Sequence, residues 1–146
     1  MTKTRIRRYK KEDVLPFYEA VSESKVELSK WFQWCHDDYS LNDAREWVTV
    51  MVPDIWQAKT GCEFVVEDVK TKKIVGGCCL EQLNLEQKEA GVGYWIKTTE
   101  AGKGRATAAA LQIIDFGFST LGLERIHVIP SVENIPSQKV AQKLPL

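Results

Sequence analysis

Apolar positions in the first third of the chain follow first strand spacing and then helix spacing. Residues 4–9 are compatible with a short strand. The next segment predicts a helix, because its apolar residues recur at helical intervals: Val14, Phe17, Tyr18 and Val21. Two further helical pieces follow, one around residues 28–34 and one over 41–58 with Ser40 as its expected N-cap. The opening unit is therefore strand followed by helices.

The middle of the chain predicts three consecutive strands. They are CEFVVEDV at 62–69, KIVGGCCLEQLNL at 73–85 and EAGVGYWIK at 89–97, and short polar turns join them. Strands joined by tight turns pair with their neighbours in opposite directions. We expect an antiparallel meander.

The last third predicts a helix, a strand and a final helix. The first helix spans 103–121 and stops at Gly122, with an apolar stripe for packing on the sheet: Ala106, Ala110, Ile113, Ile114, Gly117, Phe118 and Leu121. Residues 123–131 supply the strand, and 133–144 the last helix, with Pro136 tolerated in its first turn. The order of elements predicts one α/β (α+β) domain over residues 1–146, with a right-handed strand, helix, strand crossover near its end.

Composition narrows the class of protein. The 146 residues are 44% hydrophobic, enough for one domain with a real core, and 20 basic side chains balance 20 acidic ones. This balance disfavours nucleic acid as a partner. The four cysteines form no CxxC pair and the two histidines lie far apart, so we expect no metal site. The absence of a long apolar run or signal core predicts a soluble cytoplasmic protein without a membrane partner.

The stretch EAGKGRATAAAL at residues 100–111 carries the clearest chemical signal. Gly102 and Gly104 stand where a helix is about to begin, and the cations Lys103 and Arg105 alternate with them. Glycine lets the backbone come close to a ligand, and the first amides of a helix have no partner within it. This combination predicts a site for an anionic group such as phosphate.

Two common phosphate loops do not fit this stretch. A P-loop needs a glycine five residues before Gly-Lys, and Lys97 is there; it also needs Ser or Thr after the lysine, where Gly104 stands. A dinucleotide fingerprint needs a third glycine at position 107, which is threonine. Nucleotide binding through this loop is thus a minor alternative, and it predicts tight binding of ATP or NAD.

Four motifs together resemble the GNAT superfamily of N-acetyltransferases, most closely its ribosomal-protein N-terminal (RimJ/RimL-like) branch. They are GYWI at 93–96, AGKGRAT at 101–107, FSTLGLERI at 118–126 and VENIPSQKVAQKL at 132–144. The resemblance implies a mixed, mostly antiparallel sheet flanked by helices, with backbone amides around the pyrophosphate of acetyl-CoA. The chain differs from the family at Ala101 and Gly91, where Gln or Arg and Glu are usual, and it ends without the family's C-terminal hairpin.

The resemblance also implies site residues. The expected contacts to acetyl-CoA are Tyr94, Trp95, Ile96, Gly102, Lys103, Gly104, Arg105, Ala106, Thr107 and Asn134. Ser137 is the expected proton donor to the leaving thiolate, although Asn134 and Ser137 also suit an ordinary helix start. Glu89, and with it Glu81, is a candidate base acting through water. Aromatic residues near His36 lie where related enzymes form a wall beside the substrate.

These observations predict an enzyme that moves the acetyl group of acetyl-CoA to a primary amine by direct attack in a ternary complex. A protein N-terminus is slightly favoured over a small amine, because its reference pKa of about 8 leaves it partly neutral, whereas that of lysine is about 10.4. The alternative is a non-catalytic acyl-CoA-binding protein, suggested by Gly91 and by the missing hairpin. The sheet edge exposed by that missing hairpin also predicts a homodimer.

Overall fold

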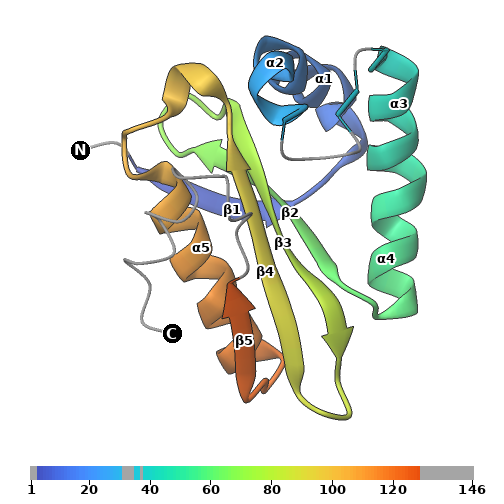
Figure 1. Ribbon diagram of the computed structural model, residues 1–146, viewed down its shortest axis with the longest axis vertical. Helices are drawn as coiled ribbons and strands as arrows, with labels where there is room; N and C mark the ends of the chain where they lie inside the picture. The colour runs from blue at the N-terminus through green and yellow to red at the C-terminus, as the bar shows by residue number, and fades with distance from the viewer. Residues whose placement is uncertain (1–2, 31–34, 37, 129–146) are drawn as a thin grey trace.

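A five-stranded sheet forms the centre of the molecule. The computed structural model describes residues 3–30, 35–36 and 38–128. The strands are β1 (Thr4–Arg8), β2 (Cys62–Asp68), β3 (Ile74–Asn84), β4 (Glu89–Ile96) and β5 (Arg125–Val128). They lie side by side in sequence order, and each neighbouring pair is antiparallel except β4 and β5, which run parallel. The predicted meander and the mixed α/β (α+β) class are confirmed (Figure 1).

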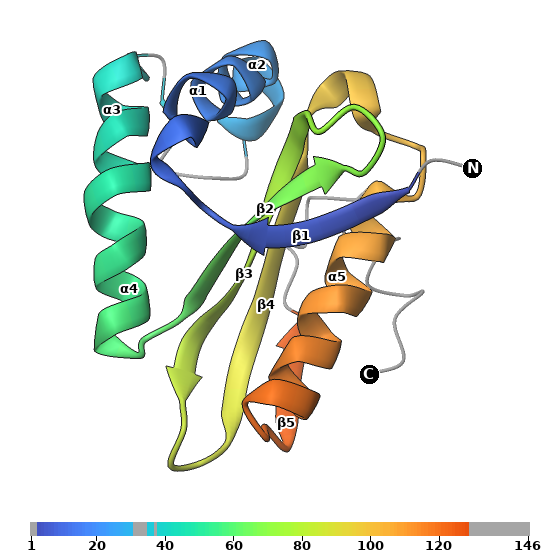
Figure 2. The same cartoon turned by 180° about the vertical axis from the view of Figure 1, so that it is seen from behind.

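Helices lie on both sides of this sheet (Figures 1 and 2). Those on one side are α1 (Val14–Glu23), α2 (Lys25–Leu28), α3 (Leu41–Glu46) and α4 (Val52–Ala58), and a π-helical turn, Trp47–Met51, joins the last two. Residues of α1 and α3 pack there with Val65 and Ile74. On the other face, α5 (Arg105–Asp115) buries Ala110 and Ile113 against β2, β3 and β4. Among the described residues no helix is long and apolar enough to cross a bilayer.

The expected N-cap at Ser40 is confirmed. The Asp43 amide donates to Ser40 Oγ at 3.2 Å, and the Ser40 amide donates to the Asp43 carboxylate at 2.9 Å. Each side chain thus satisfies one amide that the first turn of α3 leaves without a partner. The sequence signal was local, and for that reason it located the helix start correctly.

The stripe predicted for the helix after Gly104 is correct except near its end. Ile113 and Ile114 are buried as expected, but Phe118 is 39% exposed, and Phe116 packs against the core instead. The reason is a change of helical pitch, because residues Phe116–Thr120 form a π-helical turn. A wider turn moves the following side chains around the axis, so a pattern based on 3.6 residues per turn selects the wrong phenylalanine.

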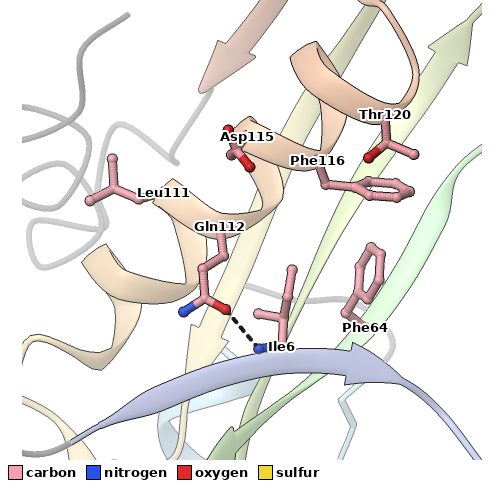
Figure 3. Close-up of a pocket in the computed structure, with 7 residues that line it drawn as sticks. All are labelled: Ile6, Phe64, Leu111, Gln112, Asp115, Phe116 and Thr120. Atoms are coloured by element: carbon pink, nitrogen blue, oxygen red, sulfur yellow. Dashed lines mark hydrogen bonds between the residues drawn. The ribbon is translucent and has the colours of Figure 1, made fainter.

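The outer edge of β1 is covered by a side chain of α5 (Figure 3). Gln112 accepts a hydrogen bond from the Ile6 amide at 3.0 Å and donates one to the Thr4 carbonyl at 2.8 Å. Its amide therefore occupies the place of a further strand, which protects an edge that would otherwise pair with another chain. Gln112 also lines an open groove of about 570 Å³ between α5 and β1.

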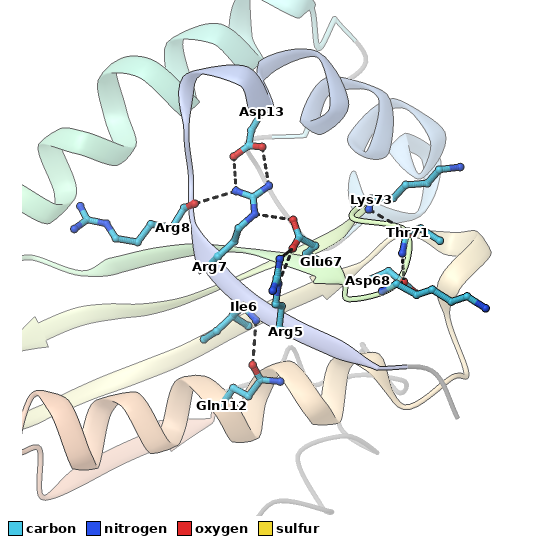
Figure 4. A network of polar contacts seen from close by, with 11 residues as sticks. Arg5, Ile6, Arg7, Arg8, Asp13, Glu67, Asp68, Thr71, Lys73 and Gln112 are labelled. Carbon is cyan, nitrogen blue, oxygen red and sulfur yellow. Dashed lines mark hydrogen bonds and ion pairs between the residues drawn. The ribbon is translucent and has the colours of Figure 1, made fainter.

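An ion-pair network joins β1, β2 and the start of α1 (Figure 4). The guanidinium of Arg7 donates to both oxygens of Asp13 at 2.8 and 2.9 Å and to Glu67 at 2.7 Å. Arg5 donates to the other oxygen of Glu67, also at 2.7 Å. Burial favours the neutral form of Glu67, but the hydrogen bonds from Arg7 and Arg5 outweigh it and lower the pKa of this carboxyl.

Candidate active site

The predicted anion site lies in the turn between β4 and α5. After a 3₁₀ turn at Thr98–Glu100, Gly102 and Gly104 adopt φ angles of 78° and 77°, and α5 begins at the next residue. L-residues rarely adopt such angles, which explains both glycines. Apart from its own chain neighbours, no atom of the described residues lies within 4 Å of the place where a Cβ would stand on either glycine. The backbone of this turn is thus open to a ligand, next to first-turn amides that have no acceptor within the helix.

Contacts from three other elements hold this turn in place. The Thr98 amide donates to Ser24 Oγ at 2.7 Å, at the end of α1. On the other side, the Arg105 guanidinium binds Asp68 at 2.6 Å, Glu100 at 2.9 Å and Thr4 at 3.2 Å. The turn is therefore anchored to α1, β1 and β2 before any ligand binds.

The side chain of Arg105 does not point toward the open side of the turn. It is only 3% exposed and is bound to two carboxylates, so the phosphate contact that we expected from its guanidinium does not fit this geometry. Hydrogen bonds from the amide of Thr71 and from Arg105 lower the pKa of Asp68 to about 2, which keeps the Asp68 partner ionised. Lys103, in contrast, is half-exposed and lies 3.1 Å from Glu100.

The end of β4 leads directly into this turn. Within the described residues, the parallel register of β4 with β5 runs from Glu89 opposite Arg125 to Val92 opposite Val128, and β4 itself runs to Ile96. Tyr94 and Ile96 pack against the core under α5, whereas Trp95 packs on the opposite face. Residues 94–96 thus end the strand that leads into the turn holding residues 102–107, and their contacts to acetyl-CoA stay predictions.

Other predicted site residues are placed differently. Glu89 lies at the far end of β4, about 23 Å along the strand from Ile96 at the usual rise per residue. The Glu89 carboxylate forms an ion pair with the Arg125 guanidinium at 3.2 Å. His36 is exposed and lies 3.8 Å from Asp43. Asn134 and Ser137 lie outside the described residues, so their roles stay predictions.

One carboxylate that the sequence pattern does not mark as a site residue is Glu63 of β2. In the register of the sheet Glu63 lies opposite Cys79 of β3, and Cys79 lies opposite Gly93 of β4. These three residues form a row across the face that α5 does not cover. A Cβ on Gly93 would come within 3.0 Å of Cys79 Sγ, so the thiol lies directly over the β4 backbone.

Glu63 has an unusual electrostatic environment. Burial, and then the negative charge of Glu81, raise the pKa of Glu63 to about 8, while a hydrogen bond with Cys79 acts in the opposite direction. In the part of the chain that the structure describes, no cation lies within 4.0 Å of the Glu63 carboxylate. Nor do these residues include a group of three His, Cys, Asp or Glu that could hold a metal ion. The signal for Glu63 is a lone carboxylate in the apolar run CEFVV, facing a glycine-rich strand.

Comparison with known proteins agrees with this geometry. The family model described as "Acetyltransferase (GNAT) domain" matches residues 3–145. The chain is 30% identical over 104 residues to the uncharacterized N-acetyltransferase p20 of Bacillus licheniformis, covering 71% of this chain and 58% of that protein. It is 26% identical over 141 residues to YdaF of Bacillus subtilis (strain 168), named as a candidate ribosomal N-acetyltransferase, covering 95% and 75%.

Solved structures show the same fold. RimL, a ribosomal L7/L12 alpha-N-protein acetyltransferase in complex with coenzyme A, superposes with a TM-score of 0.87 at 18% identity, covering 97% of this chain and 78% of that one. At this level of identity the likeness concerns the fold alone. The chain spans 58% of the length of p20, the first of the relatives above.

Proposed function

Because this chain belongs to the GNAT acetyltransferase family, we propose that it transfers the acetyl group of acetyl-CoA to a primary amine. The observation that carries the proposal is the turn at Gly102 and Gly104, where open backbone with positive φ meets the start of α5. A pyrophosphate is the kind of group that such a turn accommodates.

In this proposal each part of the turn has its own role. The backbone amides of residues 102–107, including those of Ala106 and Thr107, bind the pyrophosphate, and half-exposed Lys103 adds positive charge beside it. Arg105 acts through its internal ion pairs, which fix the shape of the turn. Main-chain groups of Tyr94, Trp95 and Ile96 bind the pantetheine arm and polarise the thioester carbonyl.

The chemistry requires a neutral amine, stabilisation of the negative charge that develops on the carbonyl oxygen, and a proton for the leaving thiolate. Direct attack within a ternary complex meets these needs without a covalent intermediate on the enzyme. Asn134 is assigned to coenzyme binding and Ser137 to protonation of the thiolate. A protein N-terminus is the favoured acceptor, and the names of YdaF and RimL support this choice.

Release of free thiol from acetyl-CoA tests the proposal. The protein is mixed with acetyl-CoA and a panel of amines that includes peptides with free N-termini, spermidine and an amino sugar. We expect amine-dependent thiol release and an acetylated product by mass spectrometry. Binding of acetyl-CoA without release over any acceptor would instead support an acyl-CoA-binding protein, and tight binding of ATP or NAD would favour the nucleotide alternative.

A further inference from the structure

The face of β4 opposite α5 is the side on which an amine can approach the strand. Val92 and Tyr94 point to the α5 side, where the hydrophobic core fills the space. On the opposite side, Gly91 and Gly93 have no side chains of their own, and the Glu81 and Cys79 side chains of β3 adjoin them. An acceptor that reaches a thioester held along Tyr94–Ile96 therefore comes over the glycines.

The side chains around these glycines carry acid groups and one thiol. Cys79 lies over Gly93, and the carboxylate of Glu81 stands 3.9 Å from the Cβ position of Gly91. Glu63 adjoins Cys79 on the next strand, about 10 Å from Gly93 at the usual spacing of two strands. A glutamate side chain together with one bound amine or water can bridge that distance.

We propose that Glu63 is the proton acceptor for the incoming amine, an inference that rests on the proposed acetyl transfer. A cationic acceptor binds with its ammonium group between Glu63 and Gly93 and gives one proton to the Glu63 carboxylate, directly or through one water. The neutral amine then attacks the carbonyl carbon, and the carbon–sulfur bond breaks. The second amine proton goes to the thiolate, and Glu63 releases the first proton to solvent.

The surroundings of Glu63 suit this role. Its pKa of about 8 is close to the reference value of about 8 for a protein N-terminus, so the proton moves between groups of similar basicity. The groups that face it are Cys79 and Glu81 of β3 and Tyr9 after β1. Burial raises the pKa of the Cys79 thiol and of the Tyr9 hydroxyl, and the charge of Glu63 adds to this effect in both. Both therefore stay neutral, and an acceptor cation supplies the positive charge missing from this place.

Glu63→Gln tests the inference through the pH dependence of kcat/KM. For the amine that the wild-type protein acetylates best, we expect a loss of roughly a hundredfold at pH 8, as for removal of a general base. The dissociation constant of acetyl-CoA, measured by calorimetry, should stay within about twofold, which also shows that the variant is folded. Glu86→Gln, a change of the same type at an exposed turn residue, is the matched control and should keep wild-type kinetics.

A second variant separates titration of Glu63 from titration of the amine. Removing the charge of Glu81 lowers the pKa of Glu63, so Glu81→Gln should move the acidic limb of the profile to lower pH, whereas Glu86→Gln should leave it in place. Wild-type kcat/KM in Glu63→Gln, or an unmoved limb in Glu81→Gln, overturns the assignment while acetyl transfer stands. A wild-type protein that binds acetyl-CoA but acetylates no amine overturns the proposed function itself.

Discussion

Two glutamates of β2 lie on the same face of the sheet, and their surroundings differ in nearly every respect. Glu67 accepts hydrogen bonds from Arg5 and Arg7, which lower its pKa despite burial. Glu63, four residues earlier, has a second carboxylate as its charged neighbour, and its pKa is raised to about 8. The two strand positions are equivalent in pattern, so the difference comes from what β1 and β3 place opposite them.

This difference separates structural from chemical use of the same residue type. A buried charge with its counterions in place is satisfied by the protein itself and needs no ligand. A half-buried carboxylate without a counterion, such as that of Glu63, carries an electrostatic cost that a cationic ligand or a proton relieves. By this criterion the Glu67 end of β2 holds the fold together, and the Glu63 end is available for chemistry.

The largest effect that we expect from this contrast is on the pH dependence of stability. The pKa of Glu63 rises from 4.5 in the unfolded chain to about 8 in the native state, so the native state holds the extra proton between these values. Stability is therefore lost as pH rises through this window, by up to roughly 5 kcal/mol, and Glu63→Gln removes the loss. In urea denaturation from pH 5 to 9, the free energy of unfolding of Glu63→Gln should rise relative to that of the wild type as pH increases. Parallel stability curves would contradict the raised pKa.

The next test concerns Glu67, for which the pH dependence of stability should have the opposite sign. Replacing it by Gln leaves Arg5 and Arg7 without their shared anion, and we expect a loss of about 3 kcal/mol at pH 7. Because the folded pKa of Glu67 is lowered, its contribution is present above the unfolded value of 4.5 and is lost at lower pH. The difference in free energy of unfolding between the wild type and Glu67→Gln should thus shrink as the pH is lowered. Glu86→Gln, at an exposed position, should change stability by less than about 0.5 kcal/mol.

How far the sequence predicts each region depends on the range of the interactions. The strands, the N-cap at Ser40 and the glycine turn before α5 are set by neighbouring residues, and each could be located from the chain alone. The partner of Arg105 is Asp68, which is 37 residues away, so nothing near Arg105 indicates that its side chain is buried.

Glu63 was missed for a similar reason. Its significance comes from Cys79, Gly93 and Glu81, which only the strand register brings beside it. The sequence favours Glu89 instead, because Glu89 stands near the position of the family's usual carboxylate, yet the sheet pairs it with Arg125 at the far end of β4. A local pattern identifies strands, whereas the charge environment of a strand residue depends on its neighbours across the sheet.

A smaller effect tests whether the glycine turn belongs to the chemical region. Gly104→Val should obstruct approach of the pyrophosphate and weaken acetyl-CoA binding at least about tenfold, or roughly 1.4 kcal/mol. Gly122→Val is the matched control, since Gly122 also has positive φ and open space at its Cβ position but lies after α5. Both variants strain the backbone, so both should lose stability. Only Gly104→Val should change the calorimetric dissociation constant, and an equal constant in the two would remove the turn from the site.

The smallest effect concerns the connection between the two regions. Arg105 joins the ion-paired end of β2, through Asp68, to the turn that we assign to the pyrophosphate, through Glu100. Lysine keeps the positive charge but cannot reproduce the fork of a guanidinium, which here binds two carboxylates and the Thr4 hydroxyl. Arg105→Lys should therefore cost about 1 kcal/mol of stability and weaken acetyl-CoA binding about threefold, because the turn then samples shapes that bind poorly.

The control for this last change is Arg5→Lys, the same substitution in the network around Glu67. Arg5 is 45% exposed and has no contact with the turn among its described partners, so its variant should lose some stability and keep the wild-type dissociation constant. If both lysine variants keep that constant, the turn holds its shape without the guanidinium, and the ion pairs of Arg105 serve folding alone. If only Arg105→Lys loses affinity, the structural end of β2 also sets how well the turn binds its ligand.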